Sequence, residues 1–151
     1  MTSHDMHSRL DAGSRCLFCV SSKGKRSREH VLRRAFKQRF PYSDQLSFSH
    51  TYRAKVEIVK RPISQFGMTV NAVCTECNNG WLNDLEGTAG KIINEFFTAT
   101  STRRQLGPDE IELLGYWVLI RSLLRTHVSP HGRAPSSLFE FAYREKCVPP
   151  G

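Results

Sequence analysis

The chain has 151 residues, of which 39% are hydrophobic and 24% are charged, and its formal net charge is +8. This length suits one domain with a hydrophobic core and excludes two ordinary domains. The longest apolar run, from Leu113 to Ile120, is much shorter than the roughly 20 residues that cross a bilayer, so the sequence predicts no membrane-spanning segment.

The first fifteen residues are polar and lack periodicity, so we expect a flexible N-terminus over residues 1–15. They contain no apolar stretch of the kind that signal peptides carry. We therefore expect a cytoplasmic protein, in which free thiols stay reduced.

Two Cys-x-x-Cys pairs follow, Cys16 with Cys19 and Cys74 with Cys77. In a reducing compartment such pairs indicate zinc before they indicate disulfides. Together they supply the four thiolates that a structural zinc ion takes in a tetrahedron. Redox pairs are the alternative, but they are typical of a βαβ context that this sequence does not predict. The fifth cysteine, Cys147, has no partner in the sequence and is expected to pack as a small apolar side chain.

Basic residues are concentrated directly after the first cysteine pair, where Glu29 is the only acid. A local excess of this kind suits the phosphate backbone of a nucleic acid, because neutralising phosphates releases condensed counterions. A solvated basic face without a partner is the alternative. The candidate nucleic-acid-binding residues are Lys23, Lys25, Arg26, Arg28, Arg33, Arg34 and Lys37.

The pattern along the middle of the chain predicts a helix and two strands. Apolar residues at helical spacing favour a helix from Ser27 to Phe40, which ends before Pro41. Alternating residues predict strands over 51–60 and 66–73, which we expect to pair as a hairpin. The second strand leads directly into Cys74.

Three further helices are predicted towards the C-terminus. One begins after Gly80 with a single apolar face, and another begins at Pro108. The second is apolar nearly all round from Ile111 to Leu124, so we expect it to be buried in the core or in a dimer interface. A short last helix is predicted within residues 137–146.

The adjacent residues Glu29 and His30 stand inside the basic run. A carboxylate can hold a hard divalent cation, which prefers oxygen ligands. An imidazole can take a proton from water near neutral pH. A surface Glu-His pair without function is the alternative.

In combination, Cys16-x-x-Cys19, Glu29-His30 and Cys74-x-x-Cys77 followed by Asn78 resemble the HNH endonuclease superfamily. The strings "SREHV" and "CNNGW" resemble a branch that is common in bacterial and phage genomes, and the resemblance covers Cys16 to Glu86 well. It implies an α+β fold with a ββα-metal, or His-Me finger, core. This treble-clef core, with zinc bound by the four paired cysteines, would span residues 16–100, and a helical C-terminal extension would span 101–151.

The resemblance also implies roles for single residues. His30 would be the general base, and Glu29 with Asn78 would hold a catalytic Mg²⁺ or Mn²⁺. Asn71 would fix the loop that carries the base, and Asn79 competes with Asn78 for the ligand position.

The sequence departs from the family pattern in carrying Asn78 where many members have His, and Leu32 and Arg33 where relatives carry Pro. The acids Asp84 and Glu86, on the helix that follows, are expected to be solvated or helix-start acids and not metal ligands.

The sequence thus predicts a metal-dependent DNA endonuclease of the HNH type, which hydrolyses phosphodiester bonds in double-stranded DNA. A homodimer through the C-terminal helices is also expected. The alternative is a non-catalytic zinc-stabilised module on the same scaffold, which binds nucleic acid or another protein.

Overall fold

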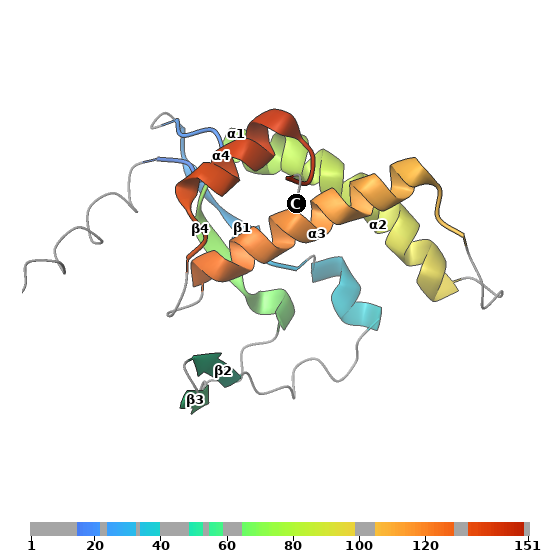
Figure 1. Cartoon of the computed structure of the whole chain (residues 1–151), viewed down its shortest axis with the longest axis horizontal. Coiled ribbons are helices and arrows are strands. Elements are labelled where there is room, and N and C mark those ends of the chain that lie inside the picture. Colours follow the sequence, from blue (N-terminus) through green and yellow to red (C-terminus); the bar gives the residue numbers. More distant parts are fainter. Residues whose placement is uncertain are drawn as a thin grey trace, which may run out of the picture.

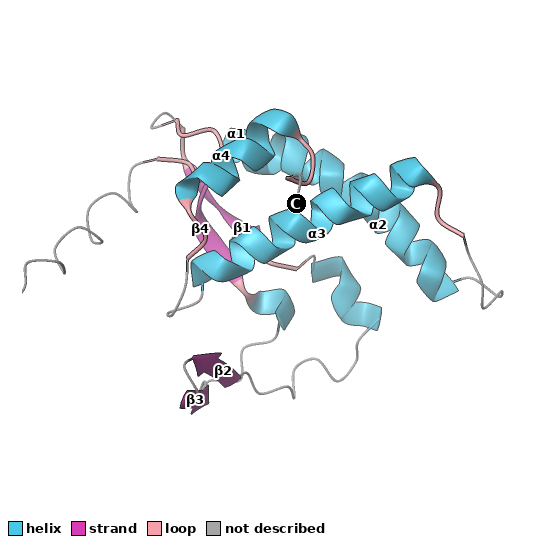
Figure 2. Cartoon of the chain, in the orientation of Figure 1, coloured by secondary structure: helices cyan, strands magenta, loops and turns pink. Residues whose placement is uncertain are grey.

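The computed structural model shows a mixed α/β chain whose described residues form two two-stranded antiparallel sheets and three longer helices, the longest of which packs against the ribbon formed by one of these sheets (Figures 1 and 2). The longer helices are α2 (Asn83–Thr98), α3 (Pro108–Val128) and α4 (Ser136–Glu145). The structure describes residues 15–21, 24–32, 34–39, 49–52, 55–58, 65–98, 105–128 and 133–149, so residues 1–14 of the predicted flexible N-terminus lie outside it. None of the helices in these ranges is long and apolar enough to cross a membrane.

The ribbon consists of β1 (Arg26–His30) and β4 (Thr69–Cys74), which pair antiparallel from Arg26 opposite Cys74 to His30 opposite Thr69. The register shifts once, between Ser27 and Glu29. Backbone hydrogen bonds of 2.9 Å continue the pairing at both ends, from Thr75 N to Lys25 O and from Val31 N to Met68 O. This ribbon therefore places the Glu29-His30 pair beside the strand that leads into the second cysteine pair.

The predicted helix from Ser27 to Phe40 is wrong. Its first part is strand β1, and only η1 (Arg34–Arg39), a 3₁₀ helix, is helical. The helical spacing came from apolar residues that serve two elements, since buried Val31 directly follows the strand and buried Phe36 lies on η1. Backbone pairing with β4 satisfies those N–H and C=O groups of residues 26–30 that face it, and this tertiary interaction outweighs the local pattern.

The predicted hairpin is also wrong in its pairing. The first alternating segment contains two strands, β2 (Ser49–Tyr52) and β3 (Lys55–Ile58), which pair with each other. The second segment forms β4, as expected for its conformation, but its partner is β1. Alternation identifies a strand and its buried face, whereas the partner depends on contacts with distant residues.

Helix α3 forms the centre of the packing, because it contacts α2, α4 and β4 (Figure 1). Its buried face includes Tyr116, Ile120 and Leu124, whereas Ile111 and Val118 are more than half exposed. Burial of this helix is therefore confirmed for one face only, and dimerisation through the C-terminal helices stays a prediction.

An aromatic cluster joins the first cysteine loop to the helices. The ring of Trp81 lies 5.1 Å from that of Phe18, 6.3 Å from that of Tyr116 and 5.8 Å from that of Tyr143, measured between centroids. Phe18 also meets Phe139 of α4 at 5.5 Å. The cluster thus fixes α3 and α4 against the segment that carries the cysteines.

Truncating this cluster should destabilise the whole chain. Phe18 is fully buried, so we expect Phe18→Ala to lower the free energy of unfolding by about 3–5 kcal/mol through lost contacts and a cavity. The matched control is Phe97→Ala, at a ring that is 43% exposed, for which we expect a loss under about 1 kcal/mol. Urea unfolding followed by circular dichroism measures both, and equal losses would contradict the assigned core.

Candidate functional site

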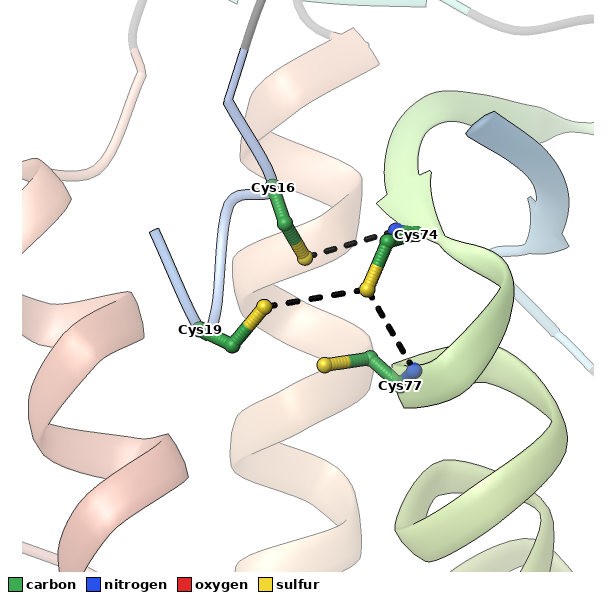
Figure 3. A group of neighbouring side chains, drawn as sticks. All are labelled: Cys16, Cys19, Cys74 and Cys77. Atoms are coloured by element: carbon green, nitrogen blue, oxygen red, sulfur yellow. Dashed lines mark hydrogen bonds between the residues drawn. The ribbon is translucent and has the colours of Figure 1, made fainter. Parts of the chain in front are cut away.

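Four cysteine sulfurs meet at the junction of the first loop, the end of β4 and the start of the helix (Figure 3). All four Sγ atoms lie within 4.8 Å of one another, and the Sγ atoms of Cys19 and Cys74 are 3.7 Å apart. A tetrahedral zinc ion with bonds of about 2.3 Å requires sulfurs about 3.8 Å apart. The prediction that Cys16, Cys19, Cys74 and Cys77 come together is confirmed, and the cluster can hold a metal ion. The cluster does not include Cys147.

The backbone holds this cluster in place. The first loop closes through a hydrogen bond of 2.9 Å from Cys16 N to Ser21 O, and Leu17 N donates to Ala72 O of β4, also at 2.9 Å. The second pair lies where β4 becomes the short helix α1 (Thr75–Cys77), and Cys77 N donates to the Cys74 sulfur at the start of that helix. Strand pairing and helix capping therefore bring the two distant pairs together.

Protons are shared unequally among these thiols. The pKa of Cys16 falls to about 4, chiefly because the Cys77 thiol donates a hydrogen bond to its sulfur. The same interaction raises the pKa of Cys77, and burial raises the pKa of Cys74 to about 11. The coupling thus favours the thiolate of Cys16 over those of its neighbours, and a metal that binds all four sulfurs displaces the protons that the thiols carry.

A second candidate site lies next to this cluster. It is a pocket of about 320 Å³ whose walls include Glu29, His30, Asn78, Asn79, Asn83 and Glu86. Arg34 and Arg121 also line it. The pocket therefore contains Glu29, His30 and Asn78, three of the four residues to which the resemblance assigns a catalytic or catalytic-metal role.

Asn78 is the first residue after the second cysteine pair, at the start of η4 (Asn78–Leu82). Its Nδ2 donates to the Ser27 hydroxyl at 2.8 Å, which attaches the helix start to β1 two residues before Glu29. This use of the amide nitrogen leaves Oδ1 as the acceptor that can face a cation. Asn79 also lines the pocket but is exposed.

Asn71 lies apart from the other candidates. It is exposed on β4 between the buried residues Val70 and Ala72, and it is not among the residues that line the pocket. Successive side chains of a strand point to opposite faces, so Asn71 is directed away from the core that its neighbours enter.

Arg121 of α3 forms an ion pair with Glu29, the candidate metal ligand. Its Nη1 lies 2.8 Å from Glu29 Oε1 and 3.1 Å from Glu86 Oε1, and it donates to the backbone carbonyl of His30 at 2.8 Å. Burial raises the pKa of Glu29, and the positive charge of Arg121 opposes this rise. Both Glu29 and Arg121 are buried, so each requires the other to compensate for lost hydration.

Glu86 lies in the first turn of α2, as the helix-start alternative expects, but it is not a solvated acid. Its carboxylate pairs with Arg121 and accepts a hydrogen bond of 2.8 Å from the indole nitrogen of Trp117. Both partners belong to α3, which packs against α2 and covers this acid. Asp84, two residues earlier, is exposed as expected.

Arg121 was missed by the sequence reasoning, although a signal was present. It is the one cation in the run from Ile111 to Leu124, which was expected to be buried. A buried arginine needs acidic partners, and the buried strand and helix of the core carry Glu29 and Glu86.

Of the described candidate nucleic-acid-binding residues, Arg34 lines the pocket and the others do not. Lys25, Arg28, Arg34 and Lys37 are exposed, and Arg26 is half-buried. Lys23 and Arg33 lie outside the described residues. Because β1 and η1 carry most of the described members, these positive charges lie on the elements that hold Glu29 and His30 or directly follow them.

Comparisons with known proteins found no relative of this chain. No family model, no curated protein and no solved structure matches this chain. Functional inference therefore depends on the residues and geometry of the two adjacent sites.

Metal content provides the first test of the cysteine cluster. We expect about one zinc ion per chain by elemental analysis, and Cys77→Ser should lose it because three thiolates and a hydroxyl bind zinc less well. The midpoint of thermal unfolding should then fall by more than about 10 °C. Cys147→Ser is the matched control and should keep both zinc and stability. Folded wild-type protein without zinc would contradict this assignment.

The buried ion pair provides a second test. Arg121→Met should lower the free energy of unfolding by about 3–5 kcal/mol, because it leaves Glu29 buried without its counter-charge. Arg125→Met, one helical turn further along α3 at an exposed position, should change it by less than about 0.5 kcal/mol. Denaturant titration compares the two variants, and similar losses would show that the pair does not stabilise the fold.

Proposed function

We propose that this chain is a zinc-stabilised, metal-dependent endonuclease of the HNH type that hydrolyses phosphodiester bonds in DNA. The observation that carries this proposal is the pocket lined by Glu29, His30 and Asn78 beside a cluster of four cysteines. In this proposal β1, β4 and the helix from α1 to α2 form a ββα-metal core of the treble-clef type. Zinc at the cysteines fixes the helix start, and thereby the direction of Asn78.

In this mechanism His30 takes a proton from a water molecule, which attacks the phosphorus of the scissile phosphate. The new oxygen–phosphorus bond forms as the bond from phosphorus to the 3′ oxygen breaks, and the departing oxygen gains a proton from solvent. Glu29 and Asn78 supply the oxygen ligands that Mg²⁺ or Mn²⁺ prefers. Such an ion would act as a Lewis acid and neutralise the charge that develops on the phosphate.

DNA is the proposed partner because of the charge around the pocket. Lys25, Arg28, Arg34 and Lys37 extend exposed cationic side chains from β1, η1 and the adjoining loop. Contacts of this type go to phosphates, so they supply affinity and orientation but little sequence information. Binding should therefore weaken steeply as salt rises.

One observation favours the non-catalytic alternative. The Glu29 carboxylate already has Arg121 as its counter-charge, and burial raises its pKa, which disfavours the ionised form that a metal needs. A module that binds nucleic acid without cleaving it would keep this ion pair permanently. In a nuclease, Glu29 would bind the metal through its second carboxylate oxygen, or the metal would replace Arg121 as the counter-charge of Glu29.

Nicking of supercoiled plasmid distinguishes the two functions. With Mg²⁺ or Mn²⁺ the wild type should convert plasmid to the open-circular form, and His30→Ala should lower the rate by about 10²- to 10⁴-fold because it removes the general base. His127→Ala is the matched control, since this histidine lies in the last turn of α3 and does not line the pocket.

Equal nicking by the wild type and His30→Ala would mean that the base is misassigned or that a contaminant cuts. DNA binding without nicking by the wild type would support the non-catalytic module.

A further inference from the structure

The guanidinium of Arg121 uses only one of its three nitrogens. Nη1 meets Glu29 Oε1, Glu86 Oε1 and the carbonyl oxygen of His30, although it carries only two hydrogens. Nε and Nη2 are buried and make no hydrogen bond with any described residue. Buried donors without acceptors are rare in folded proteins because they lose hydration without compensation.

The two unpaired nitrogens form one complete edge of the guanidinium. Two parallel N–H groups on such an edge match two oxygens of a phosphate or a carboxylate, which is the strong bidentate arrangement. Glu29 and Glu86, the two carboxylates of the pocket wall, are both engaged at Nη1. These two carboxylates leave the Nε–Nη2 edge without an acceptor, so the edge is available to a ligand.

The surroundings indicate that this ligand carries phosphate. The pocket of about 320 Å³ falls within the range of roughly 300–1,000 Å³ that holds small ligands. Arg34 adds a second cation to its wall, and exposed basic residues continue along β1 and η1. A chain of phosphates fits this distribution of charge better than a single carboxylate does.

We propose that Arg121 binds a phosphate group of the substrate through its Nε–Nη2 edge. This inference rests on the proposed function, because the phosphate is that of the nucleic acid. The edge is shielded in the ligand-free chain, so the guanidinium turns towards the pocket when the phosphate enters, while its charge continues to balance Glu29. Helix α3, which lies in the predicted C-terminal extension, thus supplies a residue that touches the substrate.

Such a contact would also position the substrate phosphate relative to Glu29 and His30. Arg121 donates to the backbone of His30 and pairs with the side chain of Glu29. A phosphate held by the same guanidinium would lie close to both residues, which lowers the entropic cost of bringing water and phosphorus together.

The test uses inorganic phosphate and the full chain, without divalent metal, so that it does not depend on cleavage. Titration calorimetry at constant ionic strength, with chloride as the competing salt, compares the wild type with Arg121→Lys. Lysine keeps the charge beside Glu29 but lacks the planar edge, so we expect binding about tenfold weaker, as for the loss of one charge-assisted hydrogen bond. Arg125→Lys, at the exposed position one turn away, should bind within about twofold of the wild type.

A second variant covers the case in which Arg121→Lys does not fold. Glu29→Gln combined with Arg121→Met removes both charges of the pair, and circular dichroism establishes whether it is folded. It should bind phosphate at least about tenfold more weakly than Glu29→Gln alone. Phosphate affinity that is equal in the wild type and in the folded Arg121 variants would overturn the proposal, as would a wild type that binds no phosphate.

Plasmid nicking separates this inference from the proposed function. If the wild type does not nick DNA but its phosphate affinity depends on Arg121, the phosphate site stands and the nuclease proposal fails. If the wild type nicks DNA and Arg121→Lys has unchanged phosphate affinity and unchanged kcat/KM, the nuclease stands and the role of Arg121 is refuted.

Discussion

The cluster of four cysteines is the constraint on which the rest of the structure depends. It ties the loop at residues 16–19 to the point where β4 becomes a helix, and so it fixes where that helix begins and how it leaves the ribbon. The residue after Cys77 is Asn78, and its amide bonds to Ser27 on the neighbouring strand. Trp81 follows within the same turn and meets rings from the first loop, α3 and α4. One short junction therefore sets both the packing of the helices and one wall of the adjacent pocket.

The pocket depends on a different kind of interaction, a buried charge cluster. Two carboxylates from β1 and α2 share one nitrogen of Arg121 from α3. A buried carboxylate such as that of Glu29 needs this cation to stay ionised, because desolvation favours the neutral form. The ion pair also links α3 to the strand that carries His30, so the C-terminal helices are part of the site.

Local chemistry was predictable from the sequence, whereas long-range pairing was not. The cysteine spacing predicted the cluster, whereas the shared site of Glu29, His30 and Asn78 was implied by the resemblance to the HNH superfamily, and these three residues do line one pocket. The helix from Ser27 to Phe40 and the hairpin failed for one common reason: β1 pairs with a strand about forty residues away, and no local period encodes that partner. Arg121 and Glu86 were missed because their role arises only where α2 and α3 meet, although an arginine in a buried run was a usable signal.

The two adjacent sites have different ligand chemistry and therefore suit different roles. Four soft sulfurs fill a tetrahedron and leave no position for a substrate, so a metal there can only hold the fold. The pocket instead offers hard oxygen donors, a histidine and open volume, but its main acid is already neutralised by a guanidinium. Under the proposed function, a divalent cation bound by Glu29 would replace Arg121 as its counter-charge, and the Arg121 guanidinium would then be available to the substrate phosphate.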